Sequence, residues 1–143
     1  MKKISLFVLL VSISVFVFAE GPAITFEKTT HDFQEINENG GPAKYNFEFT
    51  NTGDEPLVVN TVRASCGCTT PEWTKTPIEP GEKGIISVAY NPKGRPGSFA
   101  KSISVTTNAG EAQHTLIIKG KVVSVVEAPK TVEAPKSSVE APK

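Results

Sequence analysis

The feature that most constrains the fold of this chain is an alternation of apolar and polar residues with a period of two. No window of ten or more residues keeps a helical period. A two-residue period in β-branched and aromatic segments is typical of half-buried strands. The clearest runs are Tyr45-Phe47-Phe49, Ile86-Val88-Tyr90, Phe99-Ile103-Val105 (interrupted by Lys101) and Leu116-Ile118. The chain is therefore predicted to be all-β.

Turn-forming residues divide these runs at short intervals. Gly, Pro, Asn and Asp gather at 39–42, 51–56, 80–81, 92–97 and 108–110, where they favour turns. Strands are predicted near 23–28, 30–36, 43–51, 57–63, 83–91, 98–107 and 112–124, with a long loop from Ala64 to Glu82. About seven short strands predict an immunoglobulin-like antiparallel β-sandwich. Its predicted interior comprises Phe47, Phe49, Ile86, Val88, Ile103, Val105, Leu116 and Ile118.

The N-terminal segment has the features of a cleavable secretory signal. Lys2 and Lys3 precede an uncharged run from Ile4 to Phe18, and the small residue Ala19 follows. This order of basic, apolar and small residues is that of a signal peptide, and the apolar run is shorter than the roughly 20 residues of a membrane-spanning helix. Residues 1–19 are predicted to be removed. The remaining chain is expected to have no transmembrane segment and to be periplasmic or secreted.

The C-terminal segment, residues 125–143, is predicted to be a disordered tail. The sequence VEAPK occurs at 126–130, 132–136 and 139–143. Repeats of Pro and charged residues bury too little apolar surface to offset the loss of chain entropy on folding. A single immunoglobulin-like domain is therefore expected over residues 20–124.

The charge of the chain argues against nucleic acid as a partner. Its 15 basic and 15 acidic residues are mixed along the sequence, and loss of the signal would leave a net charge of −2. Nucleic-acid binding requires clustered positive charge.

Cys66 and Cys68 are the only cysteines, and Gly67 separates them. Such a pair can form a disulfide, bind a soft metal such as Cu(I), or pack as small apolar side chains. In an exported protein we expect the disulfide, at a strand end or in the following loop beside Trp73. Its three-residue ring would stabilise the fold by only about 1.6 kcal/mol, and a weakly stabilising disulfide is readily reduced.

Other candidate catalytic or metal-binding residues are few. His31 and His114 are the only histidines, and each is interpreted as a surface or packing residue of a strand. The sequence contains no phosphate-binding glycine loop, nucleophile elbow or zinc-helix motif. We therefore expect no enzymatic activity and no cofactor.

Several motifs, taken in order, resemble a bacterial domain-of-unknown-function family, the one numbered fifteen seventy-three, over about residues 24–122. They are Asp32-Phe33 with Ile36, Phe49-x-Asn51-Thr52-Gly53, Pro56-Leu57, Ser65-Cys66-Gly67-Cys68-Thr69, Pro77-Ile78-x-Pro80-Gly81-Glu82, Tyr90, Thr107-Asn108 and Gly120. The resemblance implies an immunoglobulin-type sandwich related to Hydin and major-sperm-protein-like domains, which act as interaction modules. The chain departs from the family pattern at Gln34, where Gly usually follows Asp-Phe, which puts the first-strand kink in question.

Two functions follow from these observations. The first is a non-enzymatic interaction or structural module that binds a protein partner in the cell envelope or outside the cell, with Thr69, Pro71 and Trp73 as its candidate interaction loop. The alternative is a periplasmic Cu(I)-binding or thiol-redox protein that uses Cys66 and Cys68.

Overall fold

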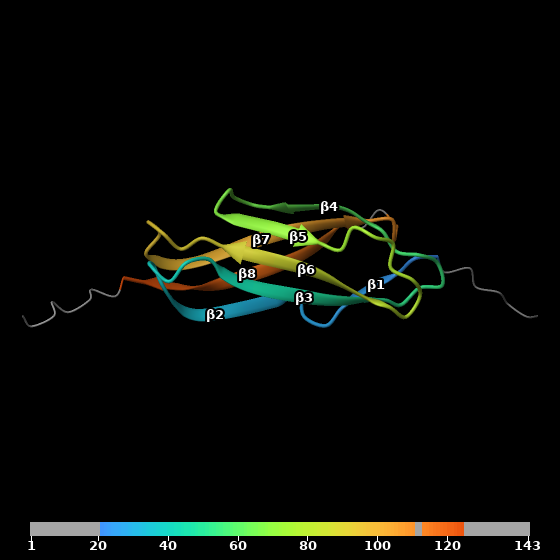
Figure 1. The fold of residues 1–143 in the computed structure, drawn as a ribbon, viewed down its shortest axis with the longest axis horizontal. Coiled ribbons are helices and arrows are strands. Elements are labelled where there is room, and N and C mark those ends of the chain that lie inside the picture. The colour runs from blue at the N-terminus through green and yellow to red at the C-terminus, as the bar shows by residue number, and fades with distance from the viewer. Residues whose placement is uncertain (1–20, 111–112, 125–143) are drawn as a thin grey trace, which may run out of the picture.

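The computed structural model describes residues 21–110 and 113–124, which form eight strands (Figure 1). The strands are β1 (Ile24–Phe26), β2 (Thr30–Asn37), β3 (Ala43–Asn51), β4 (Val59–Ala64), β5 (Thr69–Trp73), β6 (Lys83–Tyr90), β7 (Gly97–Thr107) and β8 (His114–Val123). The predicted signal, 1–19, and the predicted tail, 125–143, lie outside the described residues. No helix within the described ranges is long and apolar enough to cross a membrane.

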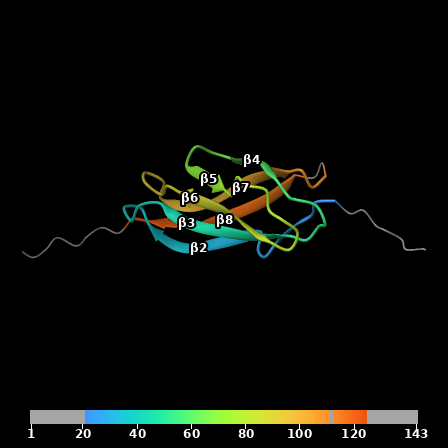
Figure 2. The same ribbon diagram turned by 45° about the vertical axis from the view of Figure 1, so that its right-hand side comes forward.

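The strands form two four-stranded sheets packed face to face (Figures 1 and 2). The first sheet has the order β1-β3-β6-β5, and the second has the order β2-β8-β7-β4. This arrangement confirms the predicted all-β sandwich. All eight residues predicted for the interior have 0% exposed surface, so the two-residue period identified the buried face of each of these strands correctly.

The prediction of a long loop with little regular structure from Ala64 to Glu82 needs correction, because that interval contains the five-residue strand β5. β5 pairs with β6 in antiparallel register, from Thr69 opposite Tyr90 to Trp73 opposite Ile86. It was missed because it is short and contains Pro71, which ordinarily argues against a strand. Proline is tolerated on an edge strand, where its missing N–H leaves no bond unmade, and β5 is at the edge of its sheet.

The sandwich is also not wholly antiparallel. β1 pairs with β3 in the first sheet, but after residues 27–29 the chain enters the second sheet, where β2 runs parallel to β8. The two predicted N-terminal strands therefore belong to different sheets. The alternation of apolar residues reports which face of a strand is buried, but it does not report which neighbour the strand pairs with.

A bulge interrupts β2 at Gln34, where the register with β8 shifts between Asp32 and Glu35. Gln34 has φ 59°, and it is the one residue other than glycine with positive φ among the described residues. Its backbone N–H donates to Asp32 Oδ1 at 2.8 Å. The kink is therefore present although Gln stands where Gly is usual, and the left-handed conformation costs an L-residue about 1 kcal/mol.

Asn51 holds together the loops at one end of the sandwich, named here the asparagine end (residues 51–57, 74–82 and 108–110). Its side chain is completely buried. The amide nitrogen donates to the carbonyls of Glu55 and Ile78 at 2.8 and 2.9 Å. The amide oxygen accepts from the N–H groups of Gly53 and Ala23 at 3.0 and 3.5 Å. All four bonds available to the amide are thus made inside the protein.

Asn108 has a similar role at the surface of the asparagine end. Its side chain accepts from the N–H of Val58 at 2.8 Å and donates to the carbonyl of Pro56 at 3.0 Å. It thereby supplies the backbone partners that the start of β4 would otherwise lack. The Asn-Thr-Gly and Thr-Asn motifs are therefore accounted for by the fold itself.

Candidate functional site

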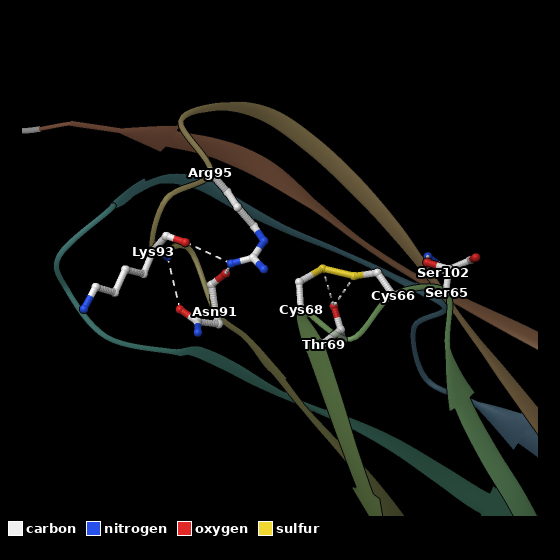
Figure 3. The surroundings of a disulfide bond; sticks show 8 residues. All are labelled: Ser65, Cys66, Cys68, Thr69, Asn91, Lys93, Arg95 and Ser102. Atoms are coloured by element: carbon white, nitrogen blue, oxygen red, sulfur yellow. Dashed lines mark hydrogen bonds between the residues drawn. A yellow bond between two sulfur atoms is a disulfide. The ribbon is translucent and has the colours of Figure 1, made fainter.

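The Ser-Cys-Gly-Cys-Thr motif forms the tight connection between β4 and β5 (Figure 3). It is at the opposite end of the sandwich from Asn51, because Thr69 and Ala43 are both opposite Tyr90, and Asn51 is at the other end of β3 from Ala43. Cys66 and Cys68 are joined by a disulfide, with their Cα atoms 5.3 Å apart. The N–H of Thr69 donates to the carbonyl of Cys66 at 3.3 Å. The Thr69 hydroxyl lies 3.7 Å from the sulfur of each cysteine. The predicted pairing is therefore present, at the end of one strand and the start of the next.

The two sulfur-bearing residues differ in their access to solvent. Cys68 is 7% exposed and Thr69 is 4% exposed, whereas Cys66 is half-buried and Gly67 is exposed. A reagent that reaches the disulfide from solvent therefore meets Cys66 first.

A second loop, residues 91–97, packs against the disulfide. The N–H of Asn91 donates to the carbonyl of Cys68 at 2.9 Å. The Arg95 guanidinium donates to the carbonyls of Lys93 and Asn91 at 2.9 and 3.4 Å. Figure 3 shows Arg95 extending back toward the Cys68 side of the motif, whereas the Lys93 side chain extends away from it. A charged group is thereby fixed beside the disulfide.

A third loop, residues 38–42, completes this end of the molecule. Glu38 Oε1 accepts from the N–H of Gly94 at 3.0 Å, which ties the third loop to the second. Residues 38–42, 65–68 and 91–97 are named here the disulfide end. Since backbone and side-chain bonds connect all three loops, their relative positions are set before any partner binds.

Tyr90 and Phe99 form an aromatic pair next to the start of β5, beside the disulfide end. Tyr90 is opposite Thr69 in the sheet, is 1% exposed and stacks on Phe99 with ring centroids 3.9 Å apart. Burial raises the pKa of Tyr90, and the nearby charge of Arg95 opposes part of that shift. The tyrosine is therefore neutral at physiological pH, and Arg95 is close enough to act on it electrostatically.

β7 lies beside the start of the disulfide motif. Ala64 pairs with Ile103, and the N–H of Ser65 donates to the carbonyl of Ser102 at 2.9 Å. Lys101, the residue that interrupts the apolar pattern, is half-buried and alternates with the buried Ile103 along β7.

The three residues predicted as an interaction loop lie in β5. Thr69 is buried, and Pro71 is half-buried on the edge strand. The Trp73 indole N–H donates to the carbonyl of Val59 at 3.2 Å, and Lys75 Nζ lies 2.9 Å from the centroid of the indole ring. Trp73 thus connects the edges of the two sheets, as a packing residue does. It lies about 13 Å along the strand from Thr69, so the expectation that it is beside the cysteines is wrong.

The two histidines pack against aromatic rings. His31 stacks on Tyr45 with centroids 3.6 Å apart and meets Phe33 edge-on at 4.5 Å. Burial is the main effect on His31, and it lowers the pKa of the imidazole. His114 lies against Phe26 at 5.8 Å. Within the described residues no group of three or more His, Cys, Asp or Glu side chains could hold a metal ion.

A shallow groove of about 660 Å³ lies on the second sheet at the β2 bulge. Gln34, Phe99 and Gly120 contribute to its lining, and the ion pairs Lys119–Asp32 (3.5 Å) and Lys121–Glu35 (3.0 Å) neutralise its charged side chains. The groove therefore carries neither the uncompensated charge nor the convergent polar groups that a small-ligand site requires.

Sequence reasoning found the two cysteines but missed Arg95 and Tyr90 as neighbours of the disulfide motif. The turn Pro-Lys-Gly-Arg-Pro-Gly at 92–97 was identified only as a turn. Its two positive charges, close to a strand end, were the available signal. Nothing in the sequence indicated that β6 and β7 would bring this turn against the β4–β5 connection.

Comparison with protein families gives a match over residues 24–122 to the model described as "Protein of unknown function (DUF1573)". A comparison with curated protein sequences gave no match.

Comparison with solved structures gives several similar folds. A protein of unknown function from Porphyromonas gingivalis W83 matches with TM-score 0.62 and 21% identity, covering 77% of this chain and 51% of that one. The VesB protease of Vibrio cholerae matches with TM-score 0.52 and 14% identity, covering 70% and 31%. WR4, an MSP family member from C. elegans, matches with TM-score 0.46 and 14% identity, covering 70% and 97%. The first two similarities show the fold alone, and this chain spans about half the length of the Porphyromonas protein.

Proposed function

The chain belongs to the DUF1573 family of proteins of unknown function, and on that premise we propose that it is an exported, non-enzymatic module that binds a protein partner in the cell envelope or outside the cell through its disulfide end. The N-terminal pattern of Lys2–Ala19 supports export. Beta-sandwich domains commonly present binding loops at the ends of a rigid scaffold.

The observation that carries this proposal is the connection of the three loops of the disulfide end to one another. The bonds Asn91 to Cys68, Arg95 to Asn91 and Gly94 to Glu38 link them in series. Loops that are ordered before binding lose less conformational entropy when a partner docks. These bonds hold exposed loops in fixed relative positions and do not enlarge the buried core.

The exposed charged side chains of this surface are basic, whereas its one acidic residue, Glu38, is half-buried. Lys93 and Arg95 are both exposed on the second loop, and Gly67 projects no side chain from the first. A Cβ placed on Gly67 would meet no atom of the protein within 4 Å, and the residue has no positive φ that would demand glycine. The partner is therefore expected to present an acidic surface that can approach the backbone at Gly67.

The proposal is tested by affinity capture from an envelope extract with matched charge reversals. We expect Lys93→Glu and Arg95→Glu each to lower capture of the partner at least tenfold. Lys75→Glu, a charge reversal at the asparagine end, should leave capture unchanged. Equal losses for all three variants, or no specific partner with the unaltered protein, would contradict the proposal. Export is checked separately by N-terminal sequencing of protein from its native cell, and an intact Met1 in the mature fraction would argue against it.

A further inference from the structure

We infer that the Cys66–Cys68 disulfide is a thiol–disulfide exchange site that accepts anionic thiols at Cys66. The substrate class is a peptide or protein cysteine flanked by carboxylates. This inference goes beyond the proposed function, because it assigns a covalent reaction to the disulfide end and does not require a stable partner.

The disulfide is not needed to hold the β4–β5 connection. The bonds Thr69 N–H to Cys66 O and Asn91 N–H to Cys68 O fix the backbone on both sides of the ring. The Ser65 hydroxyl also accepts from the N–H of Ser102 at 3.2 Å. A ring of three residues removes little entropy from the unfolded chain. The bond can therefore open without loss of the surrounding structure.

The difference in exposure between the two cysteine residues gives the reaction a direction. Because Cys66 is half-buried and Cys68 is 7% exposed, an incoming thiolate attacks the sulfur of Cys66. The sulfur of Cys68 is then the leaving group. The Thr69 hydroxyl, 3.7 Å from that sulfur, is placed to donate to it as its negative charge develops.

The positive charge beside the ring favours the same step. Hydrogen bonds to two backbone carbonyls hold the Arg95 guanidinium, which extends toward the Cys68 side of the motif (Figure 3). Cations stabilise thiolates and raise the local concentration of anionic reagents. Two independent features, exposure and charge, thus favour attack by an anionic thiol at Cys66 with release of a thiolate at Cys68.

The exchange transfers two electrons from the substrate to the cysteine pair. A substrate thiolate forms a bond to the Cys66 sulfur while the Cys66–Cys68 bond breaks, and the electron pair of that bond leaves with Cys68. A second thiolate of the same substrate then attacks the substrate sulfur that is bonded to Cys66, and Cys66 leaves as a thiolate. The substrate dithiol is oxidised to a disulfide, and the cysteine pair is reduced by two electrons and takes up two protons.

The charge preference is tested by the rates at which two small thiols reduce the purified protein. Glutathione serves as the anionic probe and cysteamine as the cationic probe, with alkylation and mass spectrometry as the readout. The reference is the oxidised free peptide Ser-Cys-Gly-Cys-Thr, which has the same ring without the fold. We expect the glutathione-to-cysteamine rate ratio to be about threefold higher in the protein, since the Arg95 cation beside the ring acts on oppositely charged reagents.

Two matched variants test whether the effect comes from the Arg95 charge, which hydrogen bonds hold beside the disulfide, or from any positive charge on the same turn. Arg95→Gln should lower the rate ratio about threefold, whereas Lys93→Gln, which removes the same charge from the same turn, should leave it within twofold. A rate ratio equal to that of the peptide, or a disulfide that neither thiol reduces while the peptide reacts, would overturn the inference.

The direction of attack is tested by trapping mixed disulfides. With oxidised glutathione as the reagent, which releases reduced glutathione in the exchange, Cys68→Ser should form a mixed disulfide on Cys66 at least about tenfold faster than Cys66→Ser forms one on Cys68, because Cys66 is the more exposed residue. Urea melts of both variants check that they are folded. Equal rates in two folded variants would overturn the assignment of Cys66.

Discussion

The two ends of the sandwich use polar groups in opposite ways. At the asparagine end, the completely buried Asn51 makes all its hydrogen bonds to backbone groups of three separate segments. At the disulfide end, by contrast, the Arg95 side chain is exposed and binds carbonyls of its own turn. A buried polar side chain contributes to stability because its removal leaves its hydrogen-bond partners buried and unsatisfied. An exposed polar side chain contributes little.

The glycines show the same contrast. A Cβ on Gly53, at the asparagine end, would collide with the backbone of Gly21 and Ala23, so only glycine allows that close approach. A Cβ on Gly67, at the disulfide end, would meet nothing. The motif residues of the first end are required by the fold, and those of the second are available for binding and chemistry.

The largest effect is expected from Asn51→Ala. The substitution leaves the carbonyls of Glu55 and Ile78 and the N–H of Gly53 without their partner, which should lower the free energy of unfolding by about 3–4 kcal/mol. Asn46→Ala, on the exposed face of the same strand, serves as the control and should change it by under about 0.5 kcal/mol. Similar urea midpoints for the two variants would show that Asn51 does not stabilise the asparagine end, and the difference between the two ends would not hold.

A smaller loss is expected from Asn108→Ala. Its two bonds, to Val58 and Pro56, are exposed to solvent, so water can replace part of what the amide provides. The free energy of unfolding should fall by about 1–2 kcal/mol. A loss as large as that of Asn51→Ala in the same melts would show that exposure does not distinguish the two asparagines.

Removal of the disulfide by the double change Cys66→Ser and Cys68→Ser should cost under about 2 kcal/mol, since the ring is so small. Chemical reduction of the unaltered protein should have the same effect, with the circular dichroism spectrum retained. Unfolding under mild reduction would mean that the disulfide end is a stability element, and the comparison would then fail.

The smallest effect, and a gain, is expected from Gln34→Gly in β2. Relief of the left-handed conformation at φ 59° should raise the free energy of unfolding by about 0.5–1 kcal/mol. Gln34→Ala keeps the same backbone cost and should be close to neutral. If glycine brings no gain over alanine in thermal melts, the bulge at this position is not strained.

The sequence by itself determined the features that depend on neighbouring residues. The two-residue alternation gave the strand faces and the eight interior side chains, because burial on one face of a strand repeats along the chain. The spacing of Cys66 and Cys68 across Gly67 likewise predicted their bond, since the two residues are close whatever the rest of the chain does.

Only the tertiary structure decided which segments meet. The parallel pairing of β2 with β8, the strand β5 at an edge that tolerates Pro71, and the position of Trp73 away from the cysteines all depend on contacts between distant residues. So does the approach of Arg95 to the disulfide. Each of these pairings is set by how two sheets pack, and a local apolar pattern specifies the buried face of a strand without specifying its neighbour.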